Sequence, residues 1–239
     1  MRVLAVDAGN TRIKWGLHDG KTWVRQGAVI QGERAGLHKA WRDLPAPEKI
    51  IVSNVAGDGA RALIGDLASR WKVRPVWICS QASQCGVKNS YAEPPQLGCD
   101  RWAALIGAWQ LLARGCVVVS VGTAMTVDVL SDEGVFRGGI IVPGVALMQQ
   151  ALAGNTAALK AQPGTYAPFP DNTGDAIASG VVQALAGAVE RMAAEAGLKD
   201  CVLSGGAADV LEPRLRLSVR RVDQLVLEGL VRIAVERDR

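Results

Sequence analysis

The strongest constraint on the fold is a pattern that the sequence contains twice. Residues 3–30 read as an apolar run, a short turn, an alternating strand, a turn at Asp19-Gly20 and a third strand. Residues 116–142 repeat this plan, so that 119–122 (VSVG) lies 113 residues after 6–9 (VDAG). Such runs separated by glycine-containing turns are typical of antiparallel strands. A repeat of this length indicates a duplicated domain rather than a solenoid.

Strand and helix patterns follow each opening. In the first half we expect a strand at 49–55, a helix at 59–71, a strand at 73–79, a loop to about residue 98 and a helix at 100–115 that ends at Gly115. In the second half we expect helices at 145–154 and 175–197, a strand followed by a glycine turn at 201–206 and a last helix at 224–237. This alternation predicts an α/β protein. We expect domains at 1–115 and 116–239, with a ligand-binding cleft between them.

The composition is that of a folded globular protein, with 49% hydrophobic and 21% charged residues. The net charge of +4 includes no block of five or six like charges, so we expect no nucleic-acid partner. The uncharged window 138–159 is long enough to span a bilayer, but it contains Pro143, Gly144 and Gly154. We therefore expect no membrane association.

The cysteines indicate a reducing compartment. There are five of them and no Cys-x-x-Cys pair, so we expect reduced and mostly structural thiols. The N-terminus does not read as a signal peptide, and we predict a cytoplasmic protein. The only histidines, His18 and His38, are too few to favour a structural zinc site or a Ser-His-Asp triad.

Two segments imitate nucleotide-binding motifs. Residues 16–22 (GLHDGKT) resemble a Walker A loop, but their glycines are one residue too close and the segment belongs to a hairpin. Residues 57–62 (GDGARA) fit a dinucleotide pattern, but the next strand has no acidic residue for a ribose. We interpret the second segment as a turn followed by a helix start.

Three turns are candidates for phosphate and nucleotide binding. In 7–14 (DAGNTRIK), Asp7 ends a strand, backbone N–H groups can face an anion, and Lys14 adds a cation. A carboxylate beside phosphates suits Mg²⁺, although an Asx-turn in a hairpin explains the same residues. Residues 122–126 (GTAMT) form a second such turn. Residues 204–206 (SGG) form a third, and the lack of side chains at its glycines suits a flat adenosine face.

The segment 98–101 (GCDR) opens a predicted helix. Asp100 can be an N-cap or first-turn acid, which the helix dipole favours. It can equally be a general base that orients and deprotonates an attacking hydroxyl, because phosphoryl transfer depends mainly on positioning and charge. Arg101 beside it can bind a substrate carboxylate.

Together these motifs resemble the type III pantothenate kinases, a family of the acetate/sugar kinase–Hsp70–actin superfamily. The matching segments, in order, are 7–14, 53–55 (SNV), 98–108 (GCDRWAALIGA), 122–128 (GTAMTVD), 138–144 (GGIIVPG), 172–177 (NTGDAI) and 204–206. The resemblance implies duplicated RNase-H-like (actin-like ATPase) domains with an interdomain cleft. It also implies a homodimer that uses ATP to phosphorylate pantothenate to 4′-phosphopantothenate, the first step of coenzyme A biosynthesis.

The resemblance implies roles for individual residues. Asp100 would be the general base, and Asp7 would hold Mg²⁺ directly or through water. The residues implied in ATP and phosphate binding are Asp7, Ala8, Gly9, Asn10, Thr11, Arg12, Ile13, Lys14, Thr123, Gly205 and Gly206. Those implied in pantothenate binding are Tyr91, Gly98, Cys99, Asp100, Arg101 and, across a dimer interface, Thr173.

One position departs from the family pattern. Ser120 stands where the family usually has an aspartate that binds a monovalent cation such as K⁺ or NH₄⁺. A hydroxyl is a weaker cation ligand than a carboxylate. We expect the dependence on a monovalent cation to be altered, or to be met partly by other groups such as backbone carbonyls.

Two other functions are compatible with this scaffold. A non-catalytic regulatory or accessory factor would explain the loss of an acid at Ser120, but such a protein has no need of a base at Asp100. A sugar kinase of the same superfamily would leave the 98–101 segment unexplained, and such enzymes are usually longer.

Overall fold

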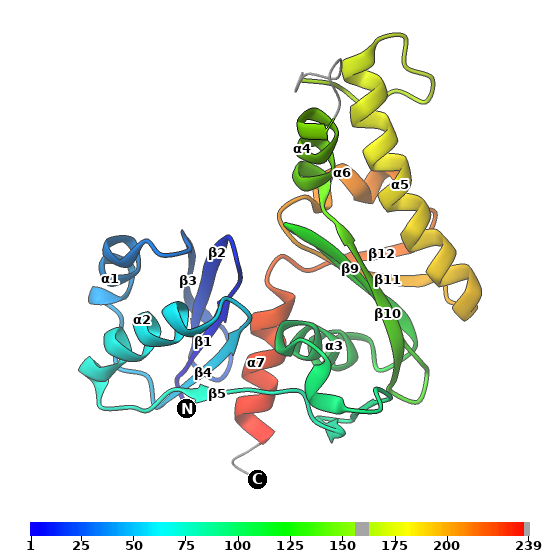
Figure 1. Ribbon diagram of the computed structural model, residues 1–239. Coiled ribbons are helices and arrows are strands. Elements are labelled where there is room, and N and C mark those ends of the chain that lie inside the picture. Colours follow the sequence, from blue (N-terminus) through cyan, green and yellow to red (C-terminus); the bar gives the residue numbers. More distant parts are fainter. Residues whose placement is uncertain (156–162, 237–239) are drawn as a thin grey trace. The chain divides into compact units, whose positions relative to one another are not determined.

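The computed structural model describes residues 1–155 and 163–236, and its contacts divide the chain into two units. The first comprises Met1–Ala113, Gly134–Phe136 and Gln224–Arg239, and the second Arg114–Glu133 and Arg137–Asp223. Figure 1 shows the elements of both units.

The first unit is built on a five-stranded sheet in the order β3-β2-β1-β4-β5. Its strands are β1 (Val3–Ala8), β2 (Arg12–His18), β3 (Trp23–Ile30), β4 (Lys49–Asn54) and β5 (Val76–Trp77). The first three form an antiparallel meander, and β4 and β5 continue it in parallel with β1. Alternate residues such as Leu4, Val6 and Val52 face a core shared with Leu37 and Ile64 of the covering helices.

Helices lie on both faces of this sheet (Figure 1). The helices α1 (Arg34–Arg42) and α2 (Asp58–Ala68), with the 3₁₀ turn η1 (Ser69–Trp71), cover the core face. On the other side α7 (Leu225–Glu236) contacts β1 and β4 and packs along α3 (Cys99–Leu112). The end of the sheet that carries Asp7 therefore lies near the start of α3.

The second unit repeats the same sheet order, β10-β9-β8-β11-β12. Its strands are β8 (Cys116–Val121), β9 (Ala124–Leu130), β10 (Val135–Pro143), β11 (Asp200–Ser204) and β12 (Ser218–Arg221). Its helices are α4 (Val145–Asn155), α5 (Thr173–Ala196) and α6 (Ala208–Leu211), followed by the 3₁₀ turn η3 (Glu212–Arg214). The predicted duplicated α/β fold is thereby confirmed, because two segments far apart in sequence each form a sheet with the same strand order.

Three local expectations are wrong. The strand expected at 73–79 shortens to Val76–Trp77, and the expected loop contains β6 (Ser83–Gln84), β7 (Val87–Asn89) and the 3₁₀ turn η2 (Pro94–Gln96). The helix expected to end at Gly115 ends at Leu112. Ala113 has a left-handed backbone conformation (φ 48°), and its N–H donates a hydrogen bond to the carbonyl oxygen of Trp109. The predicted stop at Gly197 is confirmed, with φ 70°.

The C-terminal helix belongs to the first unit, whereas the expected range 116–239 places it with the second. Its buried residues include Leu225, Leu227, Leu230 and Ile233. The compact units and the expected ranges therefore do not coincide, and the boundary of the duplication stays a prediction.

Within the described part of the chain, no helix is long and apolar enough to cross a membrane. Residues 138–155 of the uncharged window end β10 and form α4, and residues 156–159 lie outside the described residues.

Candidate active site

Asp7 lies at the carboxyl end of β1, opposite Lys14 of β2 and opposite Ser53 of β4. Residues directly opposite each other on adjacent strands project from the same face of a sheet. Ser53 is fully buried, and Asp7 and Lys14 are partly buried. The fold thus places a carboxyl, an amine and a hydroxyl group together at one end of the sheet.

The electrostatics of Asp7 bring Asp100 into the same cluster. Burial, followed by the negative charge of Asp100, raises the pKa of Asp7 to about 7, against the lowering effects of Lys14 and of a hydrogen bond with Ser53. An acid that titrates near neutrality beside a second acid is typical of a functional site.

Asp100 lies in the first turn of α3, whose N-cap is Gly98. Its Oδ1 accepts a hydrogen bond from the backbone N–H of Arg101 at 2.8 Å. Asp100 is therefore a first-turn acid rather than the N-cap. A Cβ on Gly98 would lie 2.7 Å from Asp100 Oδ1, so a side chain there would displace the carboxylate.

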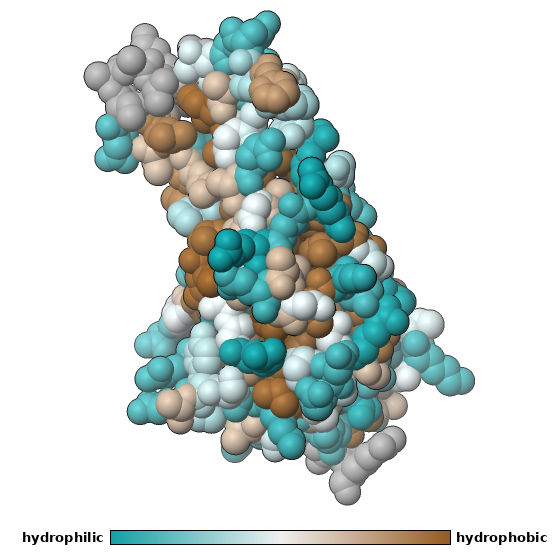
Figure 2. Space-filling view, turned by 90° about the vertical axis from the view of Figure 1, so that its right-hand side faces the viewer, coloured by the Kyte–Doolittle hydropathy of each residue, from teal (hydrophilic) through white to brown (hydrophobic). Residues whose placement is uncertain are grey.

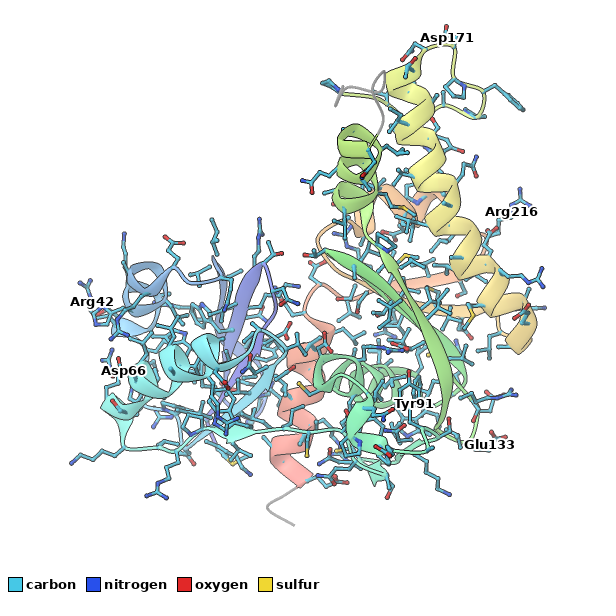
Figure 3. The ribbon with its side chains drawn as sticks, in the orientation of Figure 1. Arg42, Asp66, Tyr91, Glu133, Asp171 and Arg216 are labelled. Atoms are coloured by element: carbon cyan, nitrogen blue, oxygen red, sulfur yellow. The ribbon has the colours of Figure 1, made fainter. Side chains whose placement is uncertain are left out.

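Arg101 follows in the same turn and is only 7% exposed. Its guanidinium lies 5.8 Å from the ring centroid of Phe136, and its Nη1 lies 3.5 Å from the Tyr91 hydroxyl. The Tyr91 and Phe136 rings are 5.2 Å apart (Tyr91 is labelled in Figure 3), and the Tyr91 N–H donates to Asn89 Oδ1 at 3.0 Å. A buried guanidinium of this kind is suited to a carboxylate.

Sequence reasoning missed Phe136 and Asn89. They meet because the start of β10 pairs with β7, which matches Phe136 with Asn89. No local pattern predicts this pairing between segments 47 residues apart.

The two predicted phosphate turns have related backbones. The Gly9 N–H donates to Arg12 O at 3.1 Å, and the Gly122 N–H donates to Ala124 O at 3.0 Å. Thr123 is exposed, and its carbonyl accepts from the Gly144 N–H at 2.8 Å. A Cβ on Gly144 would collide with this turn, so Gly144 supports it. The sequence shows only a Pro-Gly turn signal there.

The second unit has three hydroxyl side chains at the strand positions that correspond to Asp7, Lys14 and Ser53 of the first unit. They belong to Ser120 and to Thr126 and Ser204, its partners on β9 and β11. Neutral groups thus stand where the first unit has an acid–amine pair, and the altered cation dependence expected at Ser120 stays a prediction.

The two glycines after Ser204 differ in what they allow. Gly205 has φ +109°, and a Cβ there would run into the backbone of Val121. Its conformation and packing therefore require glycine. A Cβ on Gly206 would meet nothing within 4 Å, so this backbone is open to a ligand.

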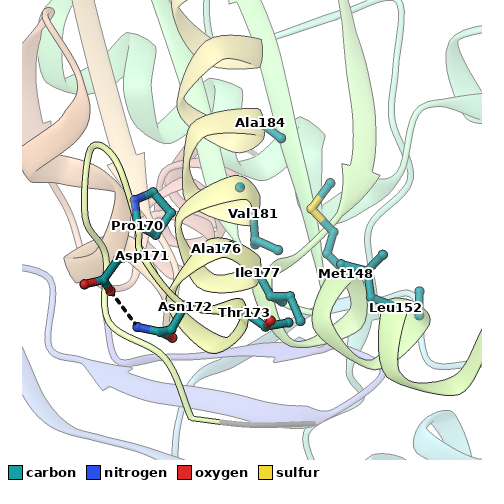
Figure 4. Close-up of a pocket in the computed structure, with 12 residues that line it drawn as sticks. Met148, Leu152, Pro170, Asp171, Asn172, Thr173, Ala176, Ile177, Val181 and Ala184 are labelled. Carbon is teal, nitrogen blue, oxygen red and sulfur yellow. Dashed lines mark hydrogen bonds between the residues drawn. The ribbon is translucent and has the colours of Figure 1, made fainter. Parts of the chain in front are cut away.

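Thr173 is the first residue of α5, after the N-cap Asn172, whose side chain accepts from the Asp175 N–H at 2.9 Å. Thr173 is exposed and lines a pocket of about 870 Å³ in the second unit. Most of the lining is apolar and comes from α4 and α5, including Met148, Leu152 and Ile177 (Figure 4).

The acids of the first unit fit a divalent ion that arrives with phosphate. Over residues 1–155 and 163–236, no group of three or more His, Cys, Asp or Glu side chains forms a metal cage. Mg²⁺ is commonly held by one or two carboxylates together with phosphate oxygens and water. Asp7 is partly buried beside Asp100, with Lys14 as a nearby positive charge, and is a suitable carboxylate for it.

The repeated sheet defines the class of protein. A ROK family glucokinase from Streptomyces griseus, solved with glucose and AMPPNP, matches the whole of both chains with a TM-score of 0.56 and 12% identity. A Campylobacter jejuni protein described as a Baf family transcriptional activator matches with a TM-score of 0.66 and 20% identity over 98% of both chains. At such identities these likenesses show the fold alone, which is that of the actin-like ATPases and sugar kinases.

Sequence relatives identify the family. The type III pantothenate kinase family matches residues 3–195. The type III pantothenate kinase of Nitrosospira multiformis is 52% identical over 98% of this chain and 91% of its own length. That of Aromatoleum aromaticum is 48% identical over 98% of both. The chain belongs to the type III pantothenate kinase family, as its motifs predicted.

Proposed function

We propose that this enzyme transfers the γ-phosphoryl group of ATP to the primary hydroxyl of pantothenate, with Asp100 as the general base. Membership of the family makes the chain a phosphotransferase of coenzyme A biosynthesis. The observation that carries the residue assignment is the cluster of Asp7, Lys14, Ser53 and Asp100 in the first unit.

In this mechanism Asp100 accepts the proton of the attacking hydroxyl. A bond forms between that oxygen and the γ-phosphorus, the bond to the bridging oxygen breaks, and ADP leaves. Lys14 places positive charge near the phosphates, while Asp7 holds Mg²⁺ directly or through water. When bound, the ion offsets the negative charge of the phosphate oxygens. Most of the rate enhancement then comes from positioning and charge.

Arg101 recognises the pantothenate carboxylate in this proposal. Phe136 and Tyr91 already hold its guanidinium, so little side-chain freedom is lost on binding. Gly98 and Cys99 contribute the backbone around the acceptor, and Thr173 contributes from the second subunit of a dimer.

The nucleotide is bound by turns of both units. The 7–14 turn of the first unit, including Asn10 and Thr11, and Thr123 of the second unit bind phosphates in this proposal. Gly205 and Gly206 lie against adenosine. The open space at Gly206 supports this role, and Gly206→Ala is expected to raise the KM for ATP with little loss of stability.

A homodimer is supported by apolar surface on the second unit. Phe169 is 94% exposed, and Leu147 and Leu152 of α4 are also exposed beside the α4–α5 pocket. Brown residues are visible on the upper part of Figure 2, the level at which Figure 1 draws these helices. Large exposed apolar side chains beside an apolar pocket support a subunit interface here. Ile177→Asp is expected to convert a dimer to monomers in sedimentation velocity.

The proposal includes an altered requirement for K⁺ or NH₄⁺, because Ser120 and its neighbours Thr126 and Ser204 are neutral. It also places the enzyme in the cytoplasm. The five cysteines are all free thiols, which suits a reducing compartment.

The decisive experiment is an ADP-release assay with pantothenate, Mg²⁺ and ATP in parallel Na⁺, K⁺ and NH₄⁺ salts. Pantothenate-dependent ADP release with a shallow salt response is the expected result. Steep, saturable activation by K⁺ would contradict the expectation for Ser120. No turnover in any salt, from folded protein, would favour the regulatory alternative. Faster phosphorylation of a sugar would favour a sugar kinase.

A further inference from the structure

A buried hydroxyl and a thiol connect the two acids of the active site. Ser53 is the second-last residue of β4 and is 0% exposed, and its Oγ lies 3.3 Å from the Sγ of Cys99. Ser53 is also hydrogen-bonded to the side chain of Asp7. Cys99 is the first residue of α3 and directly precedes Asp100. The contact therefore joins the end of the sheet to the turn that carries the base.

The direction of these hydrogen bonds follows from the groups involved. When Asp7 is ionised its oxygens only accept hydrogen bonds, and Ser53 then donates its one proton to Asp7. The Ser53 oxygen can then accept from the Cys99 thiol. Burial raises the pKa of Cys99, with smaller opposing effects from Ser53 and the backbone N–H of Asn54, and so keeps this group a thiol that can donate. The Cys99 thiol thus donates to Ser53, and the Ser53 hydroxyl donates to Asp7.

We propose that Ser53 and Cys99 are positioning residues for this reaction. By donating to one oxygen of Asp7, Ser53 orients the carboxylate toward the Mg²⁺ that accompanies ATP. Cys99 fixes the Ser53 rotamer and ties it to the turn of Asp100. This inference rests on the role assigned to Asp7 in the proposed function.

The burial of Ser53 supports a functional reason for the hydroxyl. The two residues before it on β4, Ile51 and Val52, are also 0% exposed. A buried hydroxyl gains nothing over alanine unless its hydrogen bonds offset its desolvation. Partners that orient a metal-binding carboxylate typically contribute about 10–100-fold to affinity.

The test compares Ser53→Ala, Cys99→Ala and Cys99→Ser with the control Ser80→Ala. Ser80 is 2% exposed in the same unit and donates to Leu97 O at 2.7 Å, with Gly98 O at 3.5 Å, so the control removes a buried serine hydrogen bond at the start of α3 but leaves the Cys99–Ser53–Asp7 hydrogen bonds in place. Two quantities are measured. One is the increase in melting temperature on adding Mg²⁺ and ATP without pantothenate, and the other is the separate KM values for Mg-ATP and pantothenate.

We expect Ser53→Ala to weaken Mg-ATP binding ~10–100-fold. Its KM for pantothenate at saturating Mg-ATP should change less than about twofold, because the pantothenate groups are untouched. Cys99→Ala should weaken Mg-ATP binding less, and Cys99→Ser should restore it because a hydroxyl can donate to Ser53. Ser80→Ala should lower the melting temperature without altering the Mg-ATP response.

The inference is overturned if Ser53→Ala responds to Mg-ATP like the wild type, or if both KM values change equally. It is also overturned if Cys99→Ser is as impaired as Cys99→Ala, and that pair decides the matter if Ser53→Ala does not fold. The melting response needs no acceptor. A wild type that binds Mg-ATP but does not phosphorylate pantothenate would therefore refute the proposed function, not this inference.

Discussion

Asp7 is a carboxylate that the first unit holds away from water and next to a second acid. Burial and then Asp100 raise its pKa from 3.8 to about 7, more than Lys14 and Ser53 lower it. The folded state therefore binds a proton more tightly here than the unfolded chain does. Its stabilising contribution is complete below about pH 4 and is lost as the pH rises through about 7.

The first prediction concerns the stability of the metal-free and nucleotide-free protein. At pH 8, Asp7→Asn should raise the free energy of unfolding, by at most about 4 kcal/mol, because it removes a charge that the fold disfavours. Near pH 4 the difference should disappear. Urea unfolding at both pH values measures it. A variant that is less stable than the wild type at pH 8 would show that Lys14 and Ser53 outweigh burial.

The structural and the catalytic role of Asp100 can be tested separately. Asp100 is an acid in the first turn of α3, and the N-cap is Gly98. Asp100→Asn keeps the shape of the side chain but cannot accept the proton. We expect kcat to fall ~10²–10⁴-fold, with the KM for Mg-ATP nearly unchanged. Loss of the charge at the helix start should cost less than about 1 kcal/mol. Steady-state kinetics with near-normal turnover in the variant would exclude the base assignment.

At the scale of elements, the position of α3 depends on the C-terminal helix. Backbone approaches backbone where the two helices cross, so a Cβ on Gly229 would collide with the carbonyl of Ala103. A Cβ on Gly107 of α3 would lie 2.7 Å from Leu225 O. The glycines let α7 press directly against the helix that carries Asp100 and Arg101.

Gly229→Ala should therefore push α7 away from α3. We expect a loss of about 1–3 kcal/mol in the free energy of unfolding and a higher KM for pantothenate, because Arg101 is on the displaced helix. Gly65→Ala in α2 is the matched control, since a Cβ there meets nothing within 4 Å. Alanine should be neutral or stabilising at Gly65. Equal melting temperatures for the two variants would argue against a close α3–α7 crossing.

At the scale of the whole molecule, the last helix completes the first unit. It buries Leu225, Leu227, Leu230 and Ile233, each 0–1% exposed. Burying a side chain of this size stabilises a fold by about 1.5–3 kcal/mol, so the four together approach the total stability of an ordinary domain.

A chain that ends after Asp223 should therefore lose the first unit. We expect it to lose the unfolding transition of the first unit and all turnover, whereas a chain that ends after Glu236 should behave like the full protein. Circular dichroism and the ADP-release assay measure both. A first unit that still unfolds cooperatively in the shorter chain would support the expected domain boundary near residue 115.

The sequence alone was sufficient for the duplicated sheet, the stop of α5 at Gly197, the family and the grouping of Asp7 with Lys14. These features depend on local periodicity, on turn residues and on motifs whose members are close in the chain. Only the tertiary structure placed α7 with the first unit, Phe136 behind Arg101, and Ser53 between Asp7 and Cys99. These contacts join segments that are far apart in sequence, and side-chain packing and strand pairing select them rather than any pattern within a segment.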